Sequence, residues 1–484
     1  MKRMKRTYAM ILVVTVVLLC GASIALWGCG ATQQGTAGGD AAQGTGAASA
    51  EGERDSRESE SQGRRALEFY DPKGDYKLQQ VVVLSRHNIR APLSTNGSAL
   101  AKASSHQWIE WTASGSELTS RGGALETMNG EYFRKWLEHE GLAPENWRPE
   151  NGAVRFYANA KQRTQATARY FAAGMLPVAS VDVETHAAYD TMDAVFTPQI
   201  TYLTDAYGEA ARAQVAQRFG NAGMKGVAAD LADSYKLIQD VCGYTESEGY
   251  RSGEYSDLDI SDTGIVYEVG KEPAMTGSLK TACQLSDALV LQYYESPSAI
   301  DAAFGTELTE DQWRLVSKAK DRYNDVLFSA PIVAVNLAHP LLGEIGRELD
   351  AEGRQFTFLC GHDSNIASVL GALHVRGYEL PGSVESGTPI GSKLVFERWA
   401  DSNGAAFGRV RLVYQSAEQL RAGSMLSGYE APLSVDLEFE GVEKNPDGLC
   451  DYANLRSLIA GAFDAYDELP ATYGEAAQKL EQAA

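Results

Sequence analysis

Short apolar runs alternate with longer amphipathic stretches over most of the chain. The apolar runs have the length of buried strands, and they cover residues 81–84, 154–158, 355–360, 392–399 and 410–414. Apolar residues recur with helical spacing at residues 207–219, 228–241, 279–294 and 309–327. We therefore predict an α/β fold with a central mixed, mostly parallel sheet flanked by helices. The helical stretches predict a mainly helical lobe inserted between strands of that sheet.

The N-terminus has the pattern of an export signal. Basic residues within positions 1–6 precede an apolar run from Tyr8 to about Trp27, and the sequence Leu-Trp-Gly-Cys ends at Cys29. A small residue before a cysteine, with leucine three positions ahead of it, resembles a bacterial lipoprotein processing site, so we expect Cys29 to be lipidated. Trp27 is bulkier than this pattern prefers, and about 20 apolar residues can also span a bilayer as an uncleaved anchor. Both alternatives export the body and tether it to a membrane; a periplasmic or secreted protein is the remaining alternative.

Changes in composition suggest the domain boundaries. Residues 1–29 form the predicted lipoprotein-type signal peptide. Residues 30–64 are rich in Gly, Ala, Gln, Ser and Glu, which cannot bury apolar surface, so we expect a disordered linker. The remaining residues, 65–484, can bury a large core as one domain or two lobes. Within them we expect an α/β core at about 65–200 and 336–484 and the helical lobe at about 201–335.

Net charge and cysteine spacing argue against several classes of function. The chain has a formal net charge of −21, and the first 29 residues contain only basic charges, so the body is strongly acidic. Nucleic acid is therefore not an expected partner, because its binding needs a basic surface. No Cys-x-x-Cys pair occurs, so the spacing does not fit a zinc site, and we expect neither a metal nor another cofactor. Export permits disulfides, but three complete pairings remain open for the cysteines of the body, Cys242, Cys283, Cys360 and Cys450.

The segment that follows the first apolar run carries candidate chemistry. It reads Ser-Arg-His-Asn-Ile-Arg-Ala-Pro and contains Arg86, His87 and Arg90. A guanidinium group is planar and permanently charged, and it matches pairs of phosphate oxygens. A neutral histidine can act as a nucleophile in phosphoryl transfer. Asn88 follows the histidine, and asparagine tolerates a left-handed backbone, which suggests that this turn needs it. The alternative is an ordinary surface loop.

Two further strand ends carry charged or polar side chains. After the run at 154–158 the chain enters a helix with Arg163 near its first turn, which is unfavourable unless the arginine faces an anion. After the run at 355–360, His362 and Asp363 stand where a helix begins, although Asp363 could serve only as a cap. In an open α/β sheet, ligands bind beyond the carboxyl ends of the strands. The three segments together supply three arginines, two histidines and an acid, a set suited to hydrolysis of a phosphate ester without a metal.

The chain resembles the histidine acid phosphatase family from about Leu78 to Leu458. The resemblance rests on residues 85–93, on Gly-His-Asp-Ser-Asn-Ile-Ala-Ser at 361–368, on Thr-Pro-Ile-Gly at 388–391 and on residues 413–421. Most members carry glycine where Asn88 stands, and asparagine there is the variant of the glucose-1-phosphatase branch. The resemblance also implies disulfides: Cys450 aligns with one half of a bridge, but Val442 stands where its near partner would be.

The resemblance implies a role for each candidate residue. His87 would be the nucleophile and Asp363 the proton donor to the leaving alcohol. Glu272 matches a position that contacts the sugar in the glucose-1-phosphatase branch. The phosphate would be bound by Arg86, Arg90, Arg163 and His362.

These roles predict an exported acid phosphomonoesterase that hydrolyses sugar phosphates such as glucose 1-phosphate through a phosphohistidine. We expect an acid pH optimum, because the arginines should keep His87 neutral while Asp363 must start protonated. The first alternative is a phytase or other inositol polyphosphate phosphatase; a mutase, or a surface binding protein that keeps the fold without catalysis, is less favoured. The expected partner is a small phosphate monoester, membrane contact is expected only through the N-terminal anchor, and the oligomeric state is left open.

Overall fold

The computed structural model describes residue 69 and residues 71–92, 99–259, 264–426 and 430–476, all within the unit Gly63–Ala484. The predicted signal peptide, Cys29 and the predicted linker lie outside the described residues.

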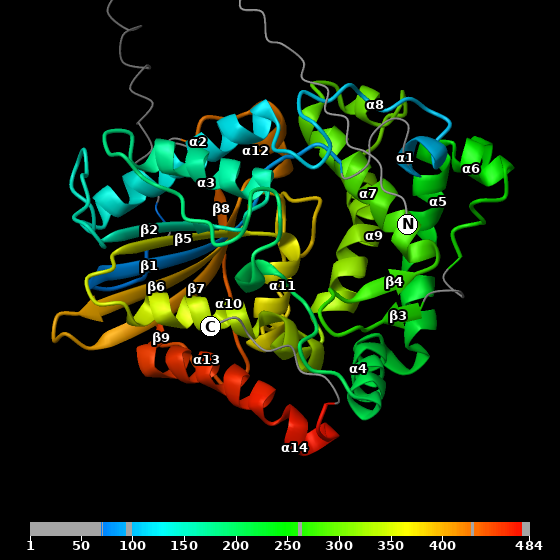
Figure 1. The fold of residues 1–484 in the computed structure, drawn as a ribbon. Coiled ribbons are helices and arrows are strands. Elements are labelled where there is room, and N and C mark those ends of the chain that lie inside the picture. The colour runs from blue at the N-terminus through cyan, green and yellow to red at the C-terminus, as the bar shows by residue number, and fades with distance from the viewer. Residues whose placement is uncertain (1–68, 70, 93–98, 260–263, 427–429, 477–484) are drawn as a thin grey trace, which may run out of the picture. The chain divides into compact units, whose positions relative to one another are not determined.

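A seven-stranded mixed sheet forms the centre of the described part of the chain (Figure 1). Its strand order is β2-β5-β1-β6-β7-β8, and β9 pairs with β7. β1 and β2 run parallel to β5, whereas the pairings of β1 with β6, β6 with β7, and β7 with β8 and β9 are antiparallel. The strands are β1 Tyr76–Arg86, β2 Val154–Ala158, β5 Phe356–Gly361, β6 Lys393–Asp401, β7 Ala406–Tyr414, β8 Leu433–Asp436 and β9 Cys450–Asp451.

The predicted α/β class with a central mixed sheet is confirmed, but the expectation that this sheet is mostly parallel is wrong. Antiparallel pairings outnumber the parallel ones, which involve only β1, β2 and β5 among the described strands. The reason is the length of the connections. Residues 402–405 alone join β6 to β7, whereas a parallel connection needs a crossover of about a dozen residues or more.

Helices cover both faces of the sheet (Figure 1). Successive side chains of a strand point to opposite faces, so β1 contributes to two apolar clusters. Val83 packs in a cluster with Phe133 of α2 and Phe171 of α3, whereas Leu84 packs in a cluster with Leu341 of α10. Burial on both faces explains why β1 reads as a continuous apolar run. The helices are α2 Ser120–His139 and α3 Gln162–Met175 on one face, and α10 Pro331–Asp350, α11 Asp363–Ala372 and α13 Tyr452–Asp467 on the other.

The helices expected between residues 200 and 335 are present and share a third apolar cluster. They are α4 Asp205–Arg218, α5 Met224–Cys242, α7 Ser278–Glu295 and α9 Glu310–Phe328. A small antiparallel pair, β3 Gly264–Val266 and β4 Ala274–Thr276, lies in the same part of the chain. The short helices are α1 Ala99–Lys102, α6 Glu248–Arg251, α8 Ala299–Ala302, α12 Ala417–Ala422 and α14 Leu469–Tyr473.

No single helix of the described residues is long and apolar enough to cross a membrane, and α9 and α10 meet that test only together, as a pair bent by 83°.

The cysteines of the body are free thiols. Cys360 is buried in β5, as its apolar surroundings in the sequence predict. Cys450, which aligns with one half of an implied bridge, donates from its thiol to the carbonyl oxygen of Gly408 at 3.3 Å. The structure therefore contains none of the disulfide pairings that the sequence left open for Cys242, Cys283, Cys360 and Cys450.

Candidate active site

The three predicted segments meet at one edge of the sheet. The parallel register places Arg86 of β1 beside Gly361 of β5 and Ala158 of β2 beside Cys360, so the three strands end close together. The chain passes from β2 into α3 and from β5 into α11 within a few residues. The first turns of these helices therefore lie at the same edge as the turn that follows β1, which is where ligands bind in open α/β sheets.

His87 is buried and held by the backbone around it. It is only 3% exposed, and its Nδ1 lies 2.9 Å from the carbonyl oxygen of Asn88. A carbonyl oxygen can only accept, so Nδ1 carries the proton and Nε2 keeps its lone pair. Burial, followed by the charges of Arg163, His362 and Arg90, lowers the pKa of His87 well below its ordinary value. The ring is therefore neutral, with its free nitrogen available as a nucleophile.

Arg86 and Arg90, which precede and follow His87 in the sequence, are both buried. Arg86 donates to Glu385 at 2.7 Å and to the carbonyl oxygen of Thr388 at 2.6 Å. Arg90 donates to Asp287 at 2.9 Å. Both guanidinium groups are thus fixed by acceptors that belong to later parts of the chain.

Arg163 lies in the first turn of α3, as predicted. Burial and the neighbouring Arg90 lower its pKa to about 10, so it remains a cation at acid and neutral pH. The buried Nε atoms of Arg86, Arg90 and Arg163 have no hydrogen-bond partner among the described residues. A buried donor without an acceptor is costly, so this group of arginines suits an anionic ligand that would supply the acceptors.

His362 is positioned by an asparagine that the sequence did not single out. Asn159 donates from Nδ2 to His362 Nε2 at 2.7 Å, and its Oδ1 accepts the backbone N–H of Asp193 at 2.9 Å. The second contact fixes the amide, so Nε2 of the histidine is the acceptor and Nδ1 carries the proton. Nδ1 lies 3.4 Å from Arg163. Burial and Arg163 lower the pKa of His362 well below its ordinary value, so the neutral ring offers an N–H donor beside that guanidinium.

Asp363 is the first residue of α11 and reaches solvent, with its side chain 24% exposed. It lies 3.4 Å from Arg86 and 3.7 Å from Lys320. Burial by itself would raise the pKa of its carboxyl. Arg86, Lys320 and other nearby cations together outweigh that effect and hold the pKa well below its ordinary value. In the free site Asp363 is therefore a carboxylate, whereas the predicted role requires it to be protonated when the reaction starts.

Glu272 lies near the same site, in the segment before β4. Its side chain is exposed, yet the protein atoms around the carboxyl displace part of its hydration, and this desolvation raises its pKa to about 7. The charge of Asp363 also raises this pKa and that of Arg163 lowers it, which places Glu272 within electrostatic reach of both. Glu272 is thus a carboxyl group at the solvent side of the site.

Comparison with known proteins agrees with this geometry. The sequence pattern of the histidine phosphatase superfamily (branch 2) matches residues 77–415. The chain belongs to this superfamily. It is 40% identical over 384 residues to glucose-1-phosphatase of Salmonella typhimurium, covering 78% of this chain and 91% of that protein. Glucose-1-phosphatase of Providencia rettgeri is 36% identical over 400 residues, covering 81% and 94%. The solved phytase from Citrobacter braakii has a TM-score of 0.72 at 26% identity, covering 80% of this chain and 98% of that one.

Asn88 has a different role in this histidine phosphatase from the one its position suggested. Its backbone does not adopt a positive φ, so the expectation of a left-handed turn residue is wrong. Its amide instead donates to Glu126 at 2.8 Å and accepts the backbone N–H of Ile89 at 2.8 Å. Glu126 is in turn 2.9 Å from the buried Lys393. Asn88 therefore ties the turn that carries His87 to a buried ion pair, which glycine could not do.

Several residues of the histidine phosphatase site were missed from sequence. Asp287 and Lys320 lie on α7 and α9, Glu385 lies in the segment before β6, and Asn159 follows β2. One signal was available. Lys320 falls on the buried face of α9 with Trp313 and Val316, at a helical spacing where an apolar residue is expected. A lysine is almost never fully buried without a partner, so its position predicts a nearby carboxylate.

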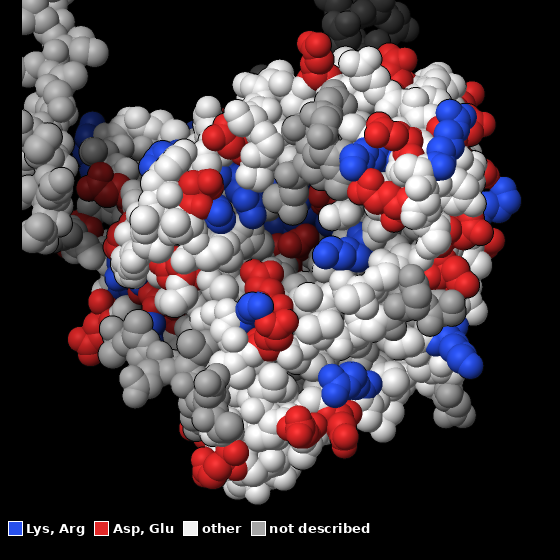
Figure 2. Space-filling model, turned by 45° about the vertical axis from the view of Figure 1, so that its right-hand side comes forward, with Lys and Arg blue, Asp and Glu red and all other residues white. Residues whose placement is uncertain are grey.

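One face of this histidine phosphatase carries charges of both signs (Figure 2). On the face drawn in Figure 2, Lys and Arg side chains are interspersed with Asp and Glu, and both kinds gather in a hollow near the middle of the view. This face has no broad basic area of the kind that binds a nucleic acid backbone.

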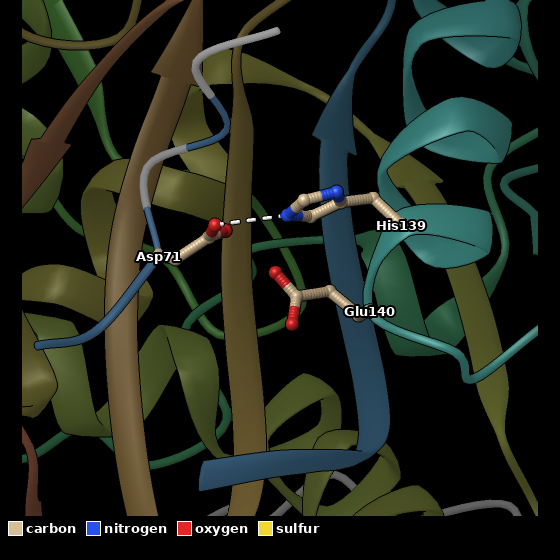
Figure 3. Close-up of side chains that lie close together, drawn as sticks. All are labelled: Asp71, His139 and Glu140. Carbon is tan, nitrogen blue, oxygen red and sulfur yellow. Dashed lines mark hydrogen bonds and ion pairs between the residues drawn. The ribbon is translucent and has the colours of Figure 1, made fainter. Parts of the chain in front are cut away.

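One group of potential metal ligands lies elsewhere in the described residues. Asp71, His139 and Glu140 offer ligand atoms within 4.8 Å of one another (Figure 3). His139 is 3.1 Å from Asp71, and Trp136 donates to Glu140 at 3.2 Å. Burial and Asp71 raise the pKa of Glu140 to about 8. The group is thus paired internally, with Glu140 protonated at neutral pH, and we assign no ion to it.

Proposed function

We propose that this protein is an exported acid phosphomonoesterase that hydrolyses sugar phosphates such as glucose 1-phosphate through a phosphohistidine. The observation that carries the proposal is the surroundings of His87. Its Nε2 lone pair is free, its ring is neutral, and three arginines with unpaired buried donors lie close to it. A nucleophile inside a cationic pocket matches the needs of phosphoryl transfer, where charge spreads over the phosphate oxygens.

In the first step, Nε2 of His87 attacks phosphorus and the ester P–O bond breaks. Asp363 gives its proton to the leaving oxygen, so the alcohol departs neutral. The free site holds Asp363 as a carboxylate, but a bound phosphate group offsets the same arginines that keep it ionised. Near pH 6 and below, phosphate monoesters carry a proton of their own. We therefore expect the proton to enter with the substrate, which explains an acid optimum.

In the second step, water attacks phosphorus and the P–N bond to His87 breaks. Asp363, now a carboxylate, accepts the proton of the water, and inorganic phosphate leaves. Arg86, Arg90, Arg163 and the Nδ1–H of His362 bind the phosphoryl oxygens in both steps.

The leaving-group side of the site supports a sugar phosphate rather than an inositol polyphosphate. Glu272, which lies there, has a pKa of about 7, so below pH 6 it is a largely neutral carboxyl group that can hydrogen-bond to hydroxyl groups but offers no positive charge to additional phosphates. Two relatives are named glucose-1-phosphatase. A phytase has the same fold, so inositol polyphosphates stay the second candidate substrates.

The N-terminal segment supports export in this proposal. Residues 1–29 would be a lipoprotein-type signal peptide with Cys29 as the lipidated residue, residues 30–64 a linker, and residues 65–484 the phosphatase domain, with the helical lobe at about 201–335. The protein would then contact the membrane only through its lipid anchor.

Phosphate release from a panel of esters tests the proposed function. We expect glucose 1-phosphate to have a higher kcat/KM than phytate, a maximum below pH 6, and full activity after treatment with a chelator. The measurement is inorganic phosphate released from glucose 1-phosphate, phytate and an aryl phosphate at several pH values, with and without chelator. A preference for phytate would replace the substrate assignment, and loss of activity in chelator would contradict the metal-free mechanism. Phosphate binding without release would identify a binding protein.

Removal of Glu272 should affect sugar substrates selectively. We expect Glu272→Ala to raise KM for glucose 1-phosphate about tenfold, the equivalent of one lost hydrogen bond, with little change for an aryl phosphate. Glu272→Gln should resemble the wild type below pH 7, because the carboxyl is then largely neutral. The matched control is Glu268→Ala, since Glu268 is an exposed glutamate nearby that pairs with Lys271. Equal losses on both substrates would show that Glu272 does not contact the sugar.

A further inference from the structure

A ring of alternating charges lies next to Asp363. Arg86 is 2.7 Å from Glu385 and 3.4 Å from Asp363, and Lys320 is 2.6 Å from Glu385 and 3.7 Å from Asp363. The side chains of Arg86, Lys320 and Glu385 are at most 5% exposed. Each charge in the ring therefore lies beside two charges of opposite sign, and water screens the three buried charges little.

The ring joins four separate parts of the chain. Arg86 ends β1, Asp363 begins α11, Glu385 lies in the segment before β6, and Lys320 comes from α9. Lys320 is thus the contact through which a helix of the predicted lobe reaches the candidate proton donor. Burial and Arg86 lower the pKa of Lys320, but Glu385, Asp363 and Asp287 raise it above its ordinary value. Burial raises the pKa of Glu385, but Lys320 and Arg86 lower it to about 2, so both stay charged at acid pH.

We propose that Lys320 is a positioning residue for the second half of the reaction, in which it holds Asp363 as a carboxylate turned toward Arg86. Water then forms the new P–O bond, the P–N bond to His87 breaks, and Asp363 takes the proton of the water. The inference rests on the proposed function, because it assigns Lys320 a role in the hydrolysis of the proposed phosphohistidine.

The two halves of the reaction make opposite demands on Asp363. It must be protonated to release the alcohol and ionised to activate water. Bound phosphoryl oxygens offset the arginines that face it, whereas Lys320 is bonded to Glu385 and is not among the proposed phosphate ligands. Lys320 can therefore favour the carboxylate while the phosphoryl group is still bound. The other charged or titratable groups within electrostatic reach of Asp363 include Arg86, His87, Arg90, Arg163, Glu272, Cys283 and His362.

Comparison of Lys320→Met with Lys318→Met tests this role. Lys318 lies on the same helix and pairs with Asp230 at the surface, so its replacement should leave the activity unchanged. In Lys320→Met we expect the phosphoenzyme to form at near the wild-type rate and to decay about 10 to 100-fold more slowly. Loss of the cation also favours protonated Asp363, so the basic limb of the pH profile for phosphoenzyme formation should move to higher pH. Quench-flow measurements of phosphoenzyme formation and decay give both readouts.

Three other results would overturn the inference or its basis. Slower formation and decay in equal proportion, with the pH limb unmoved, would show that Lys320 only maintains packing. Wild-type kinetics in Lys320→Met would show that Asp363 does not depend on it. If no phosphoenzyme formed in wild type and Lys318→Met, the proposed function itself would fail. Should Lys320→Met not fold, Lys320→Met with Glu385→Gln keeps the buried group neutral overall and is subject to the same measurements.

Discussion

Replacement of His87 by alanine is expected to abolish phosphate release, with a fall in kcat on the order of 10⁴-fold or more. His87 supplies the free Nε2 in the cationic pocket, and His362, the nearest imidazole in the structure described, has its ring centroid 5.5 Å away and its Nε2 occupied by Asn159. The second histidine therefore cannot take over as nucleophile. The measurement is phosphate release at saturating substrate, together with acid-quenched labelling of the protein by radioactive phosphate from the substrate.

The control is His139→Ala, because His139 is exposed and lies outside the site. It should retain the wild-type rate and the labelled phosphoenzyme. If His87→Ala still became labelled, another side chain would be the nucleophile. If it lost only a fewfold in kcat, direct attack by water would be the better mechanism.

Asp363→Asn is expected to separate substrates by their leaving group. For glucose 1-phosphate, whose alcohol is a poor leaving group, loss of the proton donor should lower kcat by about 10² to 10⁴-fold. For an aryl phosphate, the phenolate leaves without a proton, so the phosphoenzyme should form readily and decay slowly. Asparagine keeps the shape of the side chain and can accept the backbone N–H of Ser364 as Asp363 does at 3.0 Å, so α11 should keep its first turn. Kinetics on the two substrates and phosphoenzyme levels provide the measurement.

Asp325→Asn on α9 is the matched control, since Asp325 forms partly exposed ion pairs with Arg218 and Arg322. It should behave as wild type on both substrates. A loss of equal size in the rate of phosphoenzyme formation from both substrates in Asp363→Asn would mean that Asp363 does not protonate the leaving group. Its role would then be limited to orienting Arg86, which lies 3.4 Å away.

The local parts of the site were predictable because each belongs to a short continuous segment. A buried strand needs an unbroken apolar run, so the run that ends at Arg86 located β1 and placed His87 just beyond its carboxyl end. The same reasoning located Arg163 in α3 and Asp363 in α11. Asn88 shows the limit of local reasoning. Its tolerance of a left-handed backbone suggested a role in the turn, but its backbone has no positive φ and its side chain instead donates to Glu126.

The sequence by itself determined the α/β class, the helices between residues 200 and 335 and the strand ends that carry the candidate chemistry, because these depend on periodicity and on neighbouring residues. Tertiary structure alone decided that the sheet is more antiparallel than parallel, since pairing depends on which strands become neighbours. It also decided that Glu385 and Asp287 pair with arginines of the site and that Lys320 pairs with Glu385. These contacts join residues 65 to 299 positions apart, and no local pattern specifies which distant carboxylate a buried cation will meet.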